Sequence, residues 1–240
     1  MLLALLSMVM VPAHADEFED PWEDFNRKVH GFNMTVDRFF LKPVTKAYRF
    51  VAPEVVELGV NNAFQNLSEV PSALNGVLQG KPGSALRDSG RFLVNSTVGI
   101  AGLFDVASRL GLPSDGQEDF GQTLGLWGFD RGPYVVLPFF GSSTVRDTVG
   151  LPVQSLMSPI YHIDHTPTQN STLAMYYINR RSQLMDLEEQ LTGDHYTFIR
   201  DAYLQRREYL IKDGEVEDSF GSDMDMSEYG DFDEEEGDPF

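Results

Sequence analysis

The chain of 240 residues lacks several kinds of residue and segment, and each absence narrows what it can be. It contains no cysteine, which excludes disulfide bonds, thiolate metal sites and a cysteine nucleophile. Beyond the first fifteen residues, no apolar run approaches the ~20 residues that a membrane-spanning helix requires. Basic residues form no large cluster, so we expect no nucleic-acid partner.

Lysine and arginine are also absent from residues 213–240, which contain thirteen Asp or Glu. The rest of the chain holds 18 basic and 24 acidic groups, so most of the net charge of −19 belongs to this segment. Such a composition cannot bury enough apolar surface to fold. We therefore predict a disordered acidic tail over 213–240.

The N-terminus has the pattern of a secretory signal peptide. Leu2–Val11 is an apolar run too short to span a bilayer, and Ala13-His14-Ala15 provides a small-x-small cleavage site. No Lys or Arg precedes the run, and the alternative is an N-terminal helix of the mature protein. We predict an exported protein with a signal peptide over 1–15 and one helical domain over 16–212.

An amphipathic, basic helix is predicted next. Asp20-Pro21-Trp22-Glu23 has the pattern of a helix start, and Pro43 is expected to end the helix, with a second short helix after it. Six basic residues and one acid lie between Asn26 and Ala52. This pattern suits a helix at a membrane surface, whereas a core-facing helix with a solvated basic side is the alternative. Its apolar face consists of Phe25, Val29, Phe32, Val36, Phe39 and Phe40.

Glycine and proline occur at high density in residues 119–147. Glycine occurs at 121, 125, 128, 132 and 141, and Pro133 and Pro138 interrupt an apolar stretch. Neither a helix nor a central strand tolerates this composition well. We therefore predict irregular backbone here, with one strand at Tyr134–Leu137.

Helical periodicity accounts for most of the remaining chain. We expect a helix over 56–78 that breaks near Pro71, and a further helix capped by Ser84. Two longer helices, over 168–191 and 194–212, are expected to pack as an antiparallel pair. The predicted fold class is all-α.

One short cluster has catalytic or metal-binding potential. His162, Asp164 and His165 could form a zinc site, or a triad with Ser142 or Ser155, if the fold brings them together. Short polar clusters beside prolines are more often loop residues, and no phosphate loop, HExxH or GxSxG motif is present. We predict no metal, no cofactor and no catalytic residue. A phospholipid-hydrolysing enzyme and a soluble periplasmic binding or structural protein remain alternative functions.

Ordered motifs across residues 20–212 resemble the MlaA/VacJ family. They include DPWEDFNR at 20–27, RFLVNSTVG at 91–99, FGQTLG at 120–125, GPYVVLPF at 132–139 and IRDAYLQRR at 199–207. The resemblance implies a ring-like arrangement of amphipathic helices lying in the periplasmic leaflet of a Gram-negative outer membrane, in association with trimeric porins. It also implies a non-enzymatic function, in which mislocalised phospholipids are removed from the outer leaflet and passed to a periplasmic lipid-carrier protein.

The resemblance also leads us to expect particular roles for individual residues. Residues Phe25–Phe40 of the apolar face would lie in the membrane interface. Several family members are lipoproteins, whereas this sequence has no cysteine to acylate, so we expect anchoring by apolar burial alone. The predicted lipid path or gate consists of Gly125, Gly128, Gly132, Pro133, Tyr134, Leu137 and Phe139.

Overall fold

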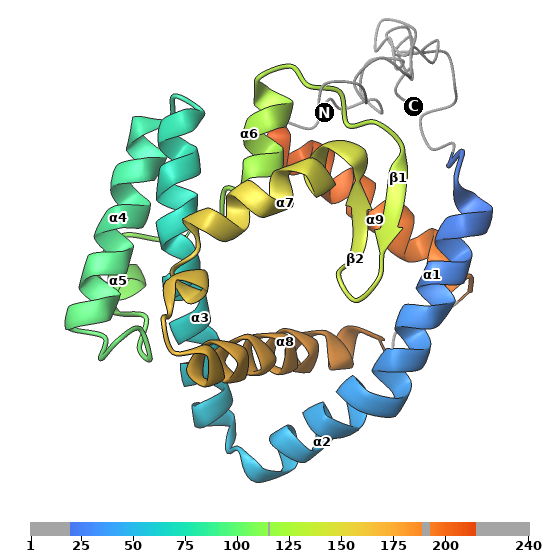
Figure 1. Ribbon diagram of the computed structural model, residues 1–240. Coiled ribbons are helices and arrows are strands. Elements are labelled where there is room, and N and C mark those ends of the chain that lie inside the picture. The colour runs from blue at the N-terminus through green and yellow to red at the C-terminus, as the bar shows by residue number, and fades with distance from the viewer. Residues whose placement is uncertain (1–19, 115, 189–192, 215–240) are drawn as a thin grey trace, which may run out of the picture.

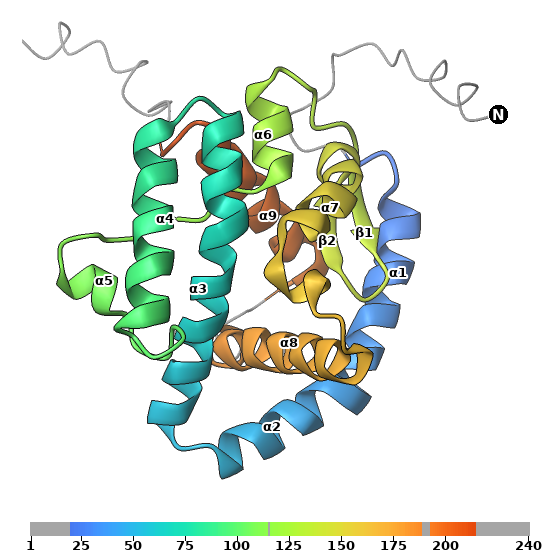
Figure 2. The same cartoon turned by 60° about the vertical axis from the view of Figure 1, so that its left-hand side comes forward.

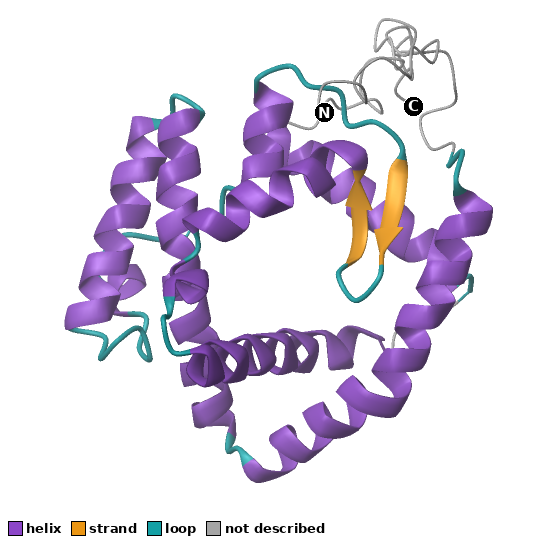
Figure 3. Ribbon diagram, in the orientation of Figure 1, coloured by secondary structure: helices purple, strands orange, loops and turns teal. Residues whose placement is uncertain are grey.

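The helices of the protein are arranged as a ring. The computed structural model describes residues 20–114, 116–188 and 193–214, and within these ranges it contains helices and a single β-hairpin (Figures 1 and 3). The predicted all-α class and ring-like arrangement are confirmed. The predicted signal peptide and the acidic tail beyond Gly214 lie outside the described residues.

The first half of the ring consists of α1 (Glu23–Val36), the π-helix η1 (Asp37–Leu41), α2 (Lys42–Val51), α3 (Glu54–Leu78), α4 (Pro82–Thr97) and the short α5 (Val106–Arg109). The helices from α1 to α3 follow one another around the edge, and α4 and α5 lie outside α3 (Figures 1 and 2).

The second half returns across the ring and closes it. Its elements are α6 (Phe120–Leu126), β1 (Tyr134–Leu137), β2 (Gly141–Thr144), α7 (Val145–Met157), the 3-10 helix η2 (Pro159–His162), α8 (Thr166–Glu188) and α9 (His195–Ile211). The ring closes where the N-terminal end of α9 contacts α1 through side chains.

Proline interrupts these helices less than the sequence predicts. The expected end at Pro43 is wrong: α1 continues through η1 into α2, and Pro43 lies in the first turn of α2. Proline has no N–H to donate to the preceding turn, and that turn is the π-helix, where the regular α-helical hydrogen-bond pattern is already interrupted. The break expected near Pro71 is also wrong, because α3 runs unbroken to Leu78 and packs against α4.

The interior of the ring's walls is polar. Among the described residues, 17 polar or charged side chains are buried but only seven hydrophobic ones. Many large hydrophobic side chains are exposed instead, and Phe50 at the end of α2 is 91% exposed. This distribution is the reverse of that in a water-soluble domain, where apolar side chains fill the core.

A buried ion pair holds α3 to α4. Arg91 Nε of α4 donates to Glu69 Oε1 of α3 over 2.8 Å, and both side chains are at most 3% exposed. Arg91 also donates to Ser108 of α5 and to the Leu112 carbonyl, so one guanidinium joins three segments. Desolvation raises the pKa of Glu69 despite the neighbouring Arg91.

Helix α6 forms where irregular backbone is expected. Asp119 caps it by accepting the Gln122 N–H over 2.9 Å, and the prolines of this segment all follow its last turn. Glycines permit α6 and α7 to pack closely: a methyl group on Gly150 of α7 would lie 3.3 Å from the Gly121 nitrogen of α6. A second strand, β2, also forms beside the predicted one.

The expected pairing of the last two helices is wrong. Helix α8 packs against α2 and α3, whereas α9 packs against α6 and β2 (Figure 1). Charged side chains determine this arrangement, because Arg181 of α8 binds Asp37 of η1 while Arg207 of α9 binds Asp119. The expected cap at Ser84 is also absent, since α4 begins at Pro82.

We expect Arg91→Leu to lower the free energy of unfolding by about 3–5 kcal/mol, because it leaves the Glu69 carboxylate buried without its partner. Chemical denaturation of the purified protein measures this change. Arg109→Leu removes an exposed guanidinium nearby and should change stability by no more than about 0.5 kcal/mol. Equal losses in the two variants would contradict the role given to the buried pair.

Candidate functional site

The β-hairpin extends towards the middle of the ring (Figure 1). Its antiparallel strands pair Tyr134 with Thr144 and Leu137 with Gly141, so Pro138–Phe140 forms the turn. Phe139 has a φ of +66°, which is unusual for a residue with a side chain, and it is 70% exposed. The turn therefore presents exposed aromatic side chains on a strained backbone.

Two asparagines of α1 form hydrogen bonds with the edge of β1 that faces away from β2. The Asn26 side-chain amide donates to the Tyr134 carbonyl over 3.0 Å and accepts the Val136 N–H over 2.8 Å. Asn33 does the same two turns later, donating to the Leu137 carbonyl over 2.9 Å and accepting the Phe139 N–H over 2.8 Å. These side chains replace a third strand, so the hairpin is hydrogen-bonded on both sides.

A small apolar cluster lies beneath the hairpin. It consists of Tyr134, Val136, Tyr196 and Leu204, with Val29 and Tyr203 packed against it. The Tyr134 hydroxyl shares a 2.7 Å hydrogen bond with Ser142, and burial raises the pKa of Tyr134. This cluster attaches the base of the hairpin to α9.

Charged side chains hold the helices around the base of the hairpin. Arg207 of α9 donates to Asp119, the cap of α6, and to Asp147 of α7 over 3.0 Å. Tyr203 donates to the other oxygen of Asp147 over 2.7 Å. Burial alone would raise the pKa of Asp147, but Arg207, Tyr203 and Arg146 together keep it below its ordinary value.

The ring closes where α1 meets the start of α9. Arg27 binds Asp194 over 2.7 Å and lies over the ring of Tyr196 at 4.4 Å. One turn along α1, His30 Nε2 lies 3.3 Å from His195 Nδ1. Burial, and then the neighbouring His195, lower the pKa of His30 below its ordinary value of 6.5.

The predicted path residues lie on this hairpin or in the segment that leads to its base. Gly125 is in α6, where a methyl group would meet Arg146 and Ile211 at 2.9 Å. Gly128 and Gly132 have φ values of +87° and +64°, in the turns that connect α6 to β1. Pro133, Tyr134 and Leu137 enter or form β1, and Phe139 is in the turn. The structure thus gathers Tyr134, Leu137 and Phe139 on the hairpin and leaves the glycines near its base.

Most of the predicted interface residues are exposed. Phe25, Phe32, Phe39 and Phe40 are 55%, 46%, 66% and 70% exposed. Val29 packs instead on the apolar cluster beneath the hairpin. Phe32 also contacts the hairpin turn, since its ring lies edge-on to that of Phe139 with centroids 5.3 Å apart.

The histidine cluster shows no catalytic arrangement among the described residues. The His162 ring bonds to the Leu156 carbonyl over 2.7 Å, and the His165 ring to the Thr168 hydroxyl over 2.7 Å. Ser142 bonds to Tyr134 rather than to a histidine. No group of three metal-ligating side chains is found in the described part of the chain.

Sequence reasoning did not identify Asn26 and Asn33 as site residues. A signal was present: two asparagines seven residues apart lie next to the apolar face of a helix. It indicates two amides on one side of the helix, but not that a strand more than a hundred residues away would need them.

The fold and the hairpin define the class of protein as a helical ring with a clamped hairpin that extends into it. A solved structure, presented as the structural basis for maintenance of bacterial outer membrane lipid asymmetry, aligns with a TM-score of 0.71 at 33% identity. The alignment covers 81% of this chain and 100% of that chain.

Sequence comparison gives the family. A family profile described as "MlaA lipoprotein" matches residues 18–210. An uncharacterized protein of Rickettsia conorii is 37% identical over 200 residues, covering 82% of this chain and 79% of that protein. The "Intermembrane phospholipid transport system lipoprotein MlaA" of Escherichia coli is 35% identical over 202 residues, covering 82% and 80%. The chain belongs to the MlaA family.

The expectation of anchoring without an acyl group gains no support from these relatives, because the family description and the Escherichia coli name both contain the word lipoprotein. Among the described residues, no helix is both long and apolar enough to cross a membrane.

We expect Asn33→Ala to loosen the hairpin, because it removes two hydrogen bonds from the edge of β1. At ~1–3 kcal/mol for the groups left unpaired, exchange of the Phe139 amide hydrogen should accelerate by roughly 5- to 150-fold. Hydrogen exchange of the purified protein measures this. Asn170→Ala, on the exposed side of α8, is the control and should leave the hairpin unchanged.

We expect the free energy of unfolding to fall as the pH is lowered through about 6.5. The lowered pKa of His30 means that the folded protein binds fewer protons than the unfolded chain in this range, so acid favours unfolding. Thermal unfolding midpoints between pH 7.5 and 5.5 measure the effect. His30→Phe should reduce the dependence, and the same pH dependence in both proteins would refute this assignment.

Proposed function

We propose that this chain is a non-enzymatic conduit for phospholipids in the periplasmic leaflet of a bacterial outer membrane. It would take up phospholipids that have reached the outer leaflet and deliver them to a soluble periplasmic carrier. The family membership supports this proposal, since the named relative from Escherichia coli belongs to an intermembrane phospholipid transport system.

The inverted distribution of side chains carries the proposal. Large hydrophobic residues cover the outside of the helices, while the buried contacts between them are polar. Water would oppose so much exposed apolar surface, whereas acyl chains would solvate it. The exposed phenylalanines of α1, η1 and α2 would lie among these chains, as a helix in the plane of a leaflet does.

The hairpin is the element proposed to line the lipid path. Phe139 and Phe140 at its turn are 70% and 63% exposed and would contact acyl chains. Gly128 and Gly132, whose positive φ values suit glycine, let the backbone reach β1 through tight turns. The asparagine clamps would fix the turn in position while leaving its aromatic side chains accessible.

The partners belong to the same proposal. A trimeric porin would hold the ring in the outer membrane, and the periplasmic carrier would receive lipid from the ring's periplasmic side. These partners come from the family resemblance, and the exposed apolar surface of the ring supports a neighbour in the membrane.

We expect Phe139→Asp to impair lipid removal in a strain that lacks its own copy of this protein. A charge against acyl chains costs ~2.5–3.5 kcal/mol, which corresponds to a roughly 100-fold slower transfer. Phospholipid exposed at the cell surface and outer-membrane permeability measure the loss. Phe139→Leu should retain function because it keeps an apolar side chain at the turn.

The two variants distinguish the effect of the introduced charge from the effect of backbone strain at Phe139. Aspartate tolerates a positive φ better than leucine, so an inactive Asp variant beside an active Leu variant identifies the charge as the cause. Full activity of Phe139→Asp would remove the hairpin from the path. Release of fatty acid or lysophospholipid by the purified protein would instead favour hydrolysis, and extraction of the native protein by carbonate would favour a soluble protein.

A further inference from the structure

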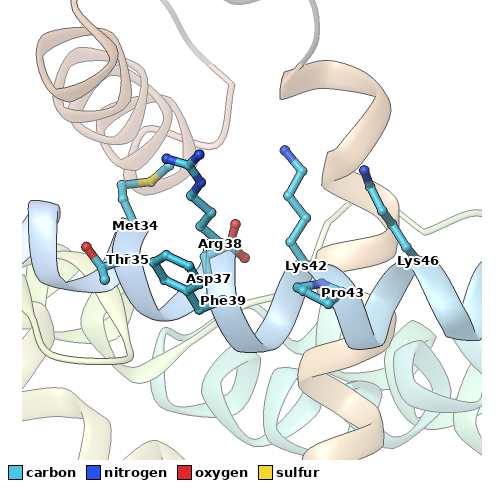
Figure 4. A pocket seen from close by; sticks show the side chains of 8 residues that line it. All are labelled: Met34, Thr35, Asp37, Arg38, Phe39, Lys42, Pro43 and Lys46. Carbon is cyan, nitrogen blue, oxygen red and sulfur yellow. The ribbon is translucent and has the colours of Figure 1, made fainter.

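An open pocket lies along the helix that runs from α1 through η1 into α2. It has a volume of about 630 Å³, within the range of small-ligand sites. Its lining combines a basic row, which we define as Arg38, Lys42 and Lys46, with the apolar side chains of Met34, Phe39 and Pro43. Figure 4 shows the three basic side chains rising side by side from one side of the helix.

The spacing of the basic row explains this arrangement. Its members are four residues apart, so each lies about one turn from the last on the same side of the helix. Phe39 and Pro43 each follow a basic residue by one position and therefore lie on the adjoining, apolar side. The row thus follows the border between the exposed apolar face and the polar flank of the helix.

The electrostatic balance in the pocket favours an anion. Its single carboxylate, Asp37, is already bound by two nitrogens of Arg181, over 2.7 and 2.9 Å. Within the described residues, neither Arg38 nor Lys46 forms an ion pair with a carboxylate, so the pocket holds two positive charges that an anion can neutralise. The Arg38 guanidinium lies 5.9 Å from the centroid of the Phe39 ring, which places cation and apolar surface together.

We propose that this pocket binds the phosphodiester headgroup of an anionic phospholipid. Arg38 and Lys46 would contact the phosphate, while the acyl chains would extend along the exposed Phe39 and Phe40 side of the helix. The inference rests on the proposed function and adds to it a headgroup preference: anionic lipids such as phosphatidylglycerol should bind better than zwitterionic phosphatidylcholine.

The test compares two charge-matched double variants of the full chain in a neutral detergent. Arg38→Gln/Lys46→Gln removes two charges from the pocket, whereas Lys28→Gln/Arg109→Gln removes two exposed charges outside it. Binding is measured with dihexanoyl phosphatidylglycerol, dihexanoyl phosphatidylcholine and inorganic phosphate as probes. Circular dichroism and thermal midpoints check that both variants fold.

The expected result is a loss of affinity for phosphatidylglycerol of roughly 30-fold in the pocket variant and little change in the control. Phosphatidylcholine should bind the native protein more weakly and respond less. Native affinity for phosphatidylglycerol in the pocket variant would overturn the site. Inorganic phosphate binding as tightly as phosphatidylglycerol would make this an ion site and would overturn the lipid assignment.

Surface phospholipid in cells separates this inference from the proposed function. If the native chain fails to clear surface phospholipid but the pocket variant still loses headgroup binding, the proposed function fails and the site stands. If the native chain clears surface phospholipid and the pocket variant binds phosphatidylglycerol as the native protein does, the function stands and the site fails.

Discussion

Hydrogen bonds and ion pairs between buried polar side chains hold this ring together, and the rest of the structure depends on them. Because many large hydrophobic side chains are exposed, the described residues form no large apolar core that could hold the helices in place. Specific polar contacts replace it, such as the buried pair between Glu69 and Arg91 and the link from Arg207 to Asp147. Helices in an apolar surround are joined in the same way, since the surround offers no hydrophobic drive for helix association.

The same principle positions the hairpin. An isolated two-stranded hairpin is marginally stable, and β1 would present an unpaired edge to its surroundings. Side-chain amides of α1 satisfy that edge, and an apolar cluster attaches the base of the hairpin to α9. Closure of the ring and placement of the hairpin therefore depend on the same contact, because both need α1 and α9 to meet. The turn keeps its exposed aromatic side chains within a tightly bonded frame.

Membership of the MlaA family and this architecture fit a common physical requirement. A protein that transfers phospholipids must tolerate acyl chains on one surface and charged headgroups on another. The helix from α1 to α2 meets that requirement within a single element: its phenylalanines are exposed and its basic side chains follow the border of the apolar face. The proposed path, the proposed headgroup pocket and the closure of the ring thus all use the same helix.

The sequence by itself determined which segments form an amphipathic helix or a strand, where the pattern of apolar residues is local. The spacing of Phe25 to Phe40 predicts an amphipathic helix, and the short apolar run Tyr134–Leu137 predicts a strand, because these patterns depend only on neighbouring residues. It also carried the family motifs, and with them the expectation of a ring. Only the tertiary structure decided that the helices continue through Pro43 and Pro71 and that α6 forms in a glycine-rich segment. It also decided that α8 and α9 pack against different neighbours and that Asn26 and Asn33 hydrogen-bond the edge of β1. Each of these depends on partners far away in the sequence, and a local pattern of polar and apolar residues does not specify which distant groups will satisfy it.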